Sequence, residues 1–132
     1  MYKVKVFFQS LAGGVDFKKI YHGNLEESNG VIKINYSDFD ENGETKTEIT
    51  VVGNDFVTVS REGQFSNFLE MKKDYGYKGE YLTPYGKIPV EIFTRELTVE
   101  LDGVYPKIKA EYKSSLMGEV TENQFSLAVK PL

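Results

Sequence analysis

The chain has 132 residues, of which 40% are hydrophobic, and a formal net charge of −4 at pH 7. This length fits one domain with an independent core, so we expect a single domain over residues 1–132. The sequence has no cysteine, which excludes a disulfide framework and a thiol nucleophile, and its mild negative charge argues against binding to a nucleic-acid backbone.

Short runs of alternating apolar and polar residues make up most of the chain. Turn signals such as Asn29-Gly30 and Asp102-Gly103 separate them roughly every 8 to 15 residues, the rhythm of a sandwich or a barrel. One helical turn is expected near residues 66–73. Alternation puts these residues on the apolar faces of successive strands: Tyr2, Val4, Val6 and Phe8; Val15, Phe17, Tyr21 and Leu25; Ile32, Ile34 and Tyr36; Ile49 and Val51; Val57 and Val59; Phe65, Leu69 and Met71; Tyr77, Tyr81 and Thr83; Ile108, Ala110 and Tyr112; Phe125, Leu127 and Val129.

The longest predicted strand follows a turn in which Pro84 and Gly86 suit the second and fourth positions. Its apolar residues take even positions up to Ile92 and odd positions from Leu97 onward. Because successive side chains of a strand point to opposite faces, one extra residue is needed to keep both halves facing inward. We therefore predict a β-bulge or sharp bend between Thr94 and Glu96.

These patterns predict an all-β fold, a single antiparallel up-and-down barrel of about eight to ten strands. Neighbouring strands that each have one apolar face close most simply into a barrel, because closure removes the free edges. A barrel of about eight strands is at the size where side chains either fill the inside or leave room for one ligand. Both outcomes remain open at this point.

The stretch Tyr81–Gly86, the strand that follows through Thr94, and the later Ile108–Tyr112 resemble the YwiB-like family of small bacterial proteins. That family is a domain of unknown function with a calycin-like β-barrel, so the resemblance implies the barrel and no activity. The wider calycin class includes lipocalins and fatty-acid-binding proteins. The chain lacks the lipocalin Gly-x-Trp opening, since it has no tryptophan, and no arginine follows Arg95 to form an Arg-x-Tyr carboxylate clamp. Lipid carriage therefore does not follow from the fold alone.

Three polar residues, Lys19, Asn67 and Arg95, fall on the apolar parity of their strands. An inward arginine beside a cavity binds a carboxylate or phosphate through two parallel hydrogen bonds. We therefore predict a ligand-binding site formed by Arg95, Lys19, Tyr81 and Tyr112. The alternative is that Arg95 pairs with an internal glutamate or reaches solvent at the mouth of the barrel.

Other site patterns are incomplete. Residues 38–43 match the start of a calcium loop, but Ile49 stands where a glutamate is required, so a charged hairpin tip is the favoured interpretation. His22, the only histidine, lies on the polar parity and is expected to face solvent. We expect no metal and no cofactor.

Three functions are compatible with the sequence: a non-enzymatic barrel that binds a small apolar or anionic molecule, an interaction or homodimerisation module, and an enzyme. The interaction module would use a strand edge near Pro89 or an aromatic patch. The enzyme has the least support, because no nucleophile is paired with a base. Since no signal peptide and no run of ~20 apolar residues is visible, we expect a cytoplasmic protein without a membrane or nucleic-acid partner.

Overall fold

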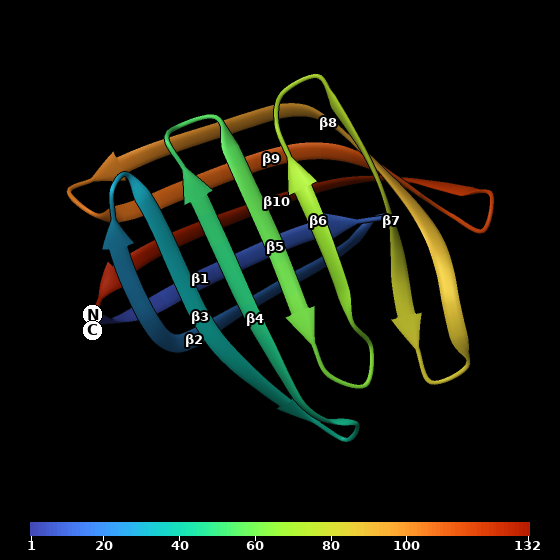
Figure 1. The fold of residues 1–132 in the computed structure, drawn as a ribbon, viewed down its shortest axis with the longest axis horizontal. Coiled ribbons are helices and arrows are strands. Elements are labelled where there is room, and N and C mark those ends of the chain that lie inside the picture. The colour runs from blue at the N-terminus through green and yellow to red at the C-terminus, as the bar shows by residue number, and fades with distance from the viewer.

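The computed structural model describes all 132 residues and contains ten strands and no helix (Figure 1). It therefore has no helix that is long and apolar enough to cross a membrane. The prediction of one helical turn near residues 66–73 is wrong, because Leu69 and Met71 alternate inward on a strand that pairs with its predecessor. The strands are β1 (Tyr2–Ala12), β2 (Val15–Ser28), β3 (Val31–Asp40), β4 (Gly43–Val52), β5 (Phe56–Glu62), β6 (Asn67–Met71), β7 (Tyr75–Thr83), β8 (Gly86–Asp102), β9 (Tyr105–Leu116) and β10 (Glu119–Pro131).

All strands belong to one antiparallel sheet with the order β6-β5-β4-β3-β2-β1-β10-β9-β8-β7. In Figure 1, β3 to β6 form a front wall, and β1, β9 and β10 run across behind it. The two ends of the sheet meet where Ser66 and Leu82 exchange two backbone hydrogen bonds of 2.7 and 2.8 Å. The predicted all-β, up-and-down barrel is thus confirmed in nearly closed form, with a single bridge across the last gap.

The predicted bulge in the long strand is also confirmed. The register of β8 against β9 shifts between Thr94 and Glu96, and Arg95 is the extra residue. Thr94 before the shift is fully buried, whereas Leu97 after it faces inward on the opposite parity. The bulge lets the first half of β8 pair with β7 and the second half follow β9 along the back wall.

The two ends of the barrel differ in what fills them. At one end, which also holds both chain termini, apolar side chains such as Val4, Leu25 and Ile108 are completely buried. The rings of Tyr2 and Tyr105 cover this closed end in an edge-to-face contact, with centroids 6.1 Å apart. The turns that follow β1, β3, β5, β7 and β9 lie at the other end, which we call the open end.

Gly23 marks the closest approach of two neighbouring strands. A Cβ atom on Gly23 would lie 2.2 Å from the backbone oxygen of Asn35 and 3.1 Å from the Cβ of Tyr36. Side chains essentially never tolerate such a contact with backbone, so β2 and β3 can reach this separation only with glycine at the position.

Replacing Gly23 by alanine should therefore destabilise the protein by about 1–3 kcal/mol, because the added methyl group forces the two strands apart. Chemical denaturation measures this change. Gly76→Ala is the matched control, since a Cβ there would meet nothing nearer than 3.9 Å. Equal effects of the two substitutions would show that the Gly23 contact does not constrain the barrel.

Candidate functional site

A cavity of about 210 Å³ lies inside the barrel. It extends to the open end, where Ala12 is exposed at the end of β1. Its lining is mostly apolar and comes from strands all round the barrel: Phe8, Ser10, Ala12, Tyr36, Ile49, Val59, Arg61, Leu69, Met71, Tyr112, Gln124 and Phe125. The aromatic side chains thus leave part of the interior unfilled.

Arg61 is the one charged residue in this lining. It follows Val57 and Val59 on the inward parity of β5 and is half-buried. Across the sheet it stands opposite Thr47 on one side and Asn67 on the other. The ion pairs of the protein join other residues, so the guanidinium has no carboxylate partner. An unpaired cation beside an apolar cavity is unusual, because partial burial of a charge is costly without compensation.

The charge of Arg61 acts on two tyrosines of the barrel interior. Burial raises the pKa values of Tyr36 and Tyr112, and in both cases the positive charge of Arg61 acts in the opposite direction. Tyr36 and Tyr112 both line the cavity with Arg61. Because these phenols stay protonated at neutral pH, the cavity presents one cation and neutral hydroxyl donors to whatever enters it.

The Asp38 carboxylate, which also acts on the pKa of Tyr36, is already engaged in an ion pair. Lys19 of β2 forms an ion pair with Asp38 of β3, and its ammonium lies 5.3 Å from the centroid of the Tyr21 ring. The Tyr21 hydroxyl lies 3.5 Å from the other Asp38 oxygen, and its ring stacks on Tyr36 at 4.3 Å. Lys19 therefore neutralises Asp38 and leaves the positive charge of Arg61 uncompensated.

Of the four residues predicted to form a ligand site, Tyr112 lines the cavity, and Lys19 forms the ion pair with Asp38. Tyr81 is on the inner face of β7, but it packs against Phe65 with ring centroids 6.2 Å apart and does not line the cavity. The structure therefore does not bring the four together.

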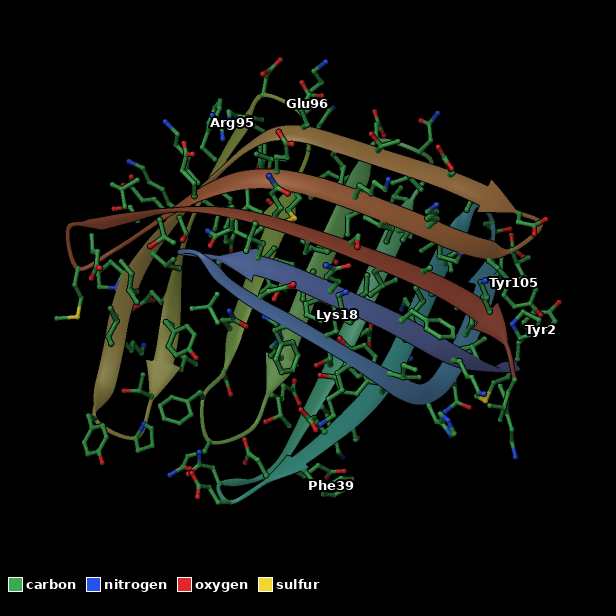
Figure 2. All side chains as sticks on the ribbon, turned by 180° about the vertical axis from the view of Figure 1, so that it is seen from behind. Tyr2, Lys18, Phe39, Arg95, Glu96 and Tyr105 are labelled. Carbon is green, nitrogen blue, oxygen red and sulfur yellow. The ribbon has the colours of Figure 1, made fainter.

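The prediction that Arg95 points inward is wrong. Its side chain is 44% exposed and lies 3.4 Å from Glu122, and Figure 2 shows it with Glu96 on the outside of the bend in β8. The reason is the bulge itself: Thr94 takes the inward position, and the extra residue leaves Arg95 and Glu96 both exposed before Leu97 turns inward. Arg61, which the sequence reasoning missed, takes the inward position expected of Arg95.

Two inward polar atoms have no hydrogen-bond partner within the protein. They are Oδ1 of Asn67, which is opposite Arg61, and Oγ1 of Thr94 in β8. The inward parity predicted for Asn67 is confirmed, since it shares a face with Leu69 and Met71. An unsatisfied amide oxygen beside an unpaired guanidinium adds to the polarity of this part of the interior.

The remaining sequence patterns have simple structural explanations. Residues 38–43 form a hairpin in which Asp40 pairs with Gly43, and Asp40 accepts a 2.8 Å hydrogen bond from the Asn42 amide. No group of three or more histidine, cysteine or acidic side chains is arranged to hold a metal ion. His22 is exposed, as its parity predicts.

A family model described as a domain of unknown function, DUF1934, matches residues 9–127. The chain belongs to this family. The crystal structure of the YwiB protein from Bacillus subtilis superposes with a TM-score of 0.88 over 99% of this chain and 92% of that chain, at 14% sequence identity. No curated protein matches the sequence. The resemblance to the YwiB-like family is thereby confirmed, and at this identity the YwiB structure supports the fold alone.

The environment of Tyr21 gives a pH-dependent prediction. Burial, and after it the nearby Asp38 carboxylate, raises the pKa of Tyr21 from 10.0 to about 12. The folded state therefore holds the Tyr21 proton more tightly than the unfolded state does. The stability that protonated Tyr21 contributes is complete below pH 10 and should be lost between pH 10 and 12. NMR of ¹³C-labelled tyrosine rings should show Tyr21 titrating late. Asp38→Asn should lower its pKa, and an unchanged value would contradict the role of Asp38.

Proposed function

We propose that this member of the DUF1934 family is a non-enzymatic binder of a small molecule that has one acidic group and a compact apolar body. The observation that carries this proposal is the unpaired Arg61 guanidinium in a mostly apolar cavity. A carboxylate or phosphate would compensate the charge of Arg61 through charge-assisted, two-point hydrogen bonds. The apolar lining would receive the rest of the molecule, with Ile49, Val59 and Leu69 on one side.

The cavity volume limits the size of the ligand. Sites for drug-sized molecules range from ~300 to 1,000 Å³, and an engineered apolar cavity of about 150 Å³ takes up benzene. At about 210 Å³, the cavity is suited to an aromatic or short aliphatic acid. A long-chain fatty acid would need the seam between β6 and β7, which one bridge closes, to open.

Binding is favoured over catalysis by what lies around Arg61. The phenols of Tyr36 and Tyr112 hold their protons at neutral pH, since burial raises their pKa values, which makes them hydrogen-bond donors and poor bases. The cavity lining contains no carboxylate, histidine or lysine that could pair with Ser10 as a base. A cytoplasmic location belongs to the same proposal.

Replacing Arg61 by methionine should weaken binding of hexanoate and benzoate roughly 10- to 100-fold, the range expected for losing a hydrogen-bonded charge pair. Isothermal titration calorimetry measures the loss. Arg95→Met is the matched control, because it removes the other arginine of the chain at an exposed position, and it should leave affinity unchanged. The uncharged amides hexanamide and benzamide should bind the unmodified protein and Arg61→Met with equally low affinity. Absence of acid binding to the unmodified protein, or an equal loss in both variants, would contradict the proposal.

The same substitution gives an independent prediction on stability. Removing an uncompensated, half-buried charge and extending the apolar lining should raise the free energy of unfolding by about 0.5–2 kcal/mol. Urea denaturation of Arg61→Met measures this change, with Arg95→Met again as the control. Destabilisation by Arg61→Met would mean that the guanidinium already stabilises the fold, and would contradict its assignment as an unpaired ligand-binding group.

Native mass spectrometry of the protein as purified from cells examines the proposal without choosing a ligand in advance. It should show a bound acid of small mass that Arg61→Met fails to retain. The same spectra report the subunit count, and so test the alternative that the protein is a homodimer.

A further inference from the structure

The outer face of the back wall carries a group of lysines around an apolar centre. Ile20 of β2, Phe7 of β1 and Ala128 of β10 lie side by side across the three strands. Ile20 is 55% exposed and Phe7 37% exposed. Lys5 and Lys130 flank this row on one side, Lys18 and Lys109 flank it on the other, and Lys107 continues it on β9 opposite Ala128. Lys18, Lys107 and Lys109 line a groove beside the row. We call these five lysines and the three apolar residues the lysine face; Figure 2 shows Lys18 on it.

None of the five lysines has a carboxylate partner within the protein. The lysines that form ion pairs are Lys19, Lys73, Lys78 and Lys113. Of these, only Lys19 lines the groove, and it is paired with Asp38. The acidic residues near this face stand at its edge without pairing to these lysines: Asp16 accepts a hydrogen bond from Gln9, Glu100 stands opposite Lys107, and Glu96 and Glu111 line a surface hollow with Asp16 and Lys109. The positive charge of this face is therefore free to act on another molecule.

The register places two like charges directly opposite each other on this face. Lys5 is directly opposite Lys130 on the β1–β10 ladder, an arrangement that destabilises a sheet. The Lys130 ammonium lies 5.8 Å from the centroid of the Phe7 ring, which partly compensates it. In a protein with a net charge of −4, none of these five lysines is held in place by an ion pair of the fold.

We propose that the lysine face docks an acidic protein segment in which an apolar residue is flanked by carboxylates. The apolar residue would cover Phe7 and Ile20, while the carboxylates on its two sides reach the two groups of lysines. This pattern of an apolar centre with a charged rim is the usual anatomy of a protein-binding patch. The groove of about 360 Å³ beside Phe7 and Ile20 gives the apolar residue a place to enter.

The composition of the face favours a protein segment over other polyanions. Single-stranded nucleic acids need successive exposed rings on which bases stack, and this face has one ring, already covered by Lys130. Membrane binding by a surface needs apolar side chains that reach into the headgroup region, but Phe7 is only 37% exposed and Ala128 is half-buried. This site is on the outside of the barrel and does not depend on the Arg61 cavity.

The test uses fluorescence anisotropy with a labelled peptide that alternates glutamate with leucine and phenylalanine. We expect saturable binding that weakens as salt is added. The triple variant Lys18→Gln, Lys109→Gln and Lys130→Gln should lose at least tenfold in affinity. The matched control is Lys33→Gln, Lys46→Gln and Lys87→Gln, which removes the same charge from exposed positions outside the face, and it should change affinity less than twofold.

Two further measurements decide between partners. Ile20→Ser should weaken peptide binding severalfold without changing any charge, and Arg61→Met should leave it unchanged. A single-stranded uridine oligonucleotide and phosphatidylglycerol vesicles should bind more weakly than the peptide. The proposal is overturned if the peptide does not bind, or if both triple variants lose affinity for it equally. It is also overturned if the RNA or the vesicles bind more tightly than the peptide and the lysine-face triple variant abolishes that binding.

Discussion

The single extra residue in β8 is the constraint on which the rest of the barrel depends. The 17 residues of β8 pass from one wall of the barrel to the other, and the two walls cross. The inward residues are even-numbered before the bend and odd-numbered after it, which one regular alternation cannot provide. The shift at Arg95 lets Ile92 and Thr94 face inward before the bend and Leu97 after it. Without it, Leu97 and Val99 would face solvent and the back wall would lose part of its apolar lining.

Burial differs between the two ends of the barrel, and this difference determines where a charge can stand inside it. The closed end buries side chains such as Val4, Leu25 and Ile108 completely, and an arginine there would be prohibitively costly. Toward the open end, Arg61 is only half-buried and the phenols of Tyr36 and Tyr112 provide polar neighbours. A cation is therefore tolerated where the interior begins to open, which is also where a ligand would enter.

The sequence predicted the fold well and the site poorly, for one reason. Alternation in each strand predicts which face is apolar, and that was sufficient for the barrel, the meander and the position of the bulge. Next to a bulge the same rule fails, so the inward position assigned to Arg95 was wrong although the bulge was correctly located. Arg61 continues the parity of Val57 and Val59 without interruption, so strict extension of β5 could have found it. No pattern along the chain predicts that Lys19 engages Asp38, because that contact depends on how β2 approaches β3.

Phe7 and Phe8, adjacent on β1, connect the two surfaces that we propose for binding. Phe8 faces the cavity with Arg61, and Phe7 faces outward among the lysines. The two surfaces use positive charge differently, since exposed charges more than a Debye length of ~8–10 Å apart are largely screened by salt, whereas a partly buried pair is screened much less. Recognition at the lysine face should therefore depend strongly on ionic strength, while an acid bound at Arg61 should be held with little change. The Arg61 cavity and the lysine face thus lie on opposite sides of one sheet, and their electrostatic interactions respond differently to salt.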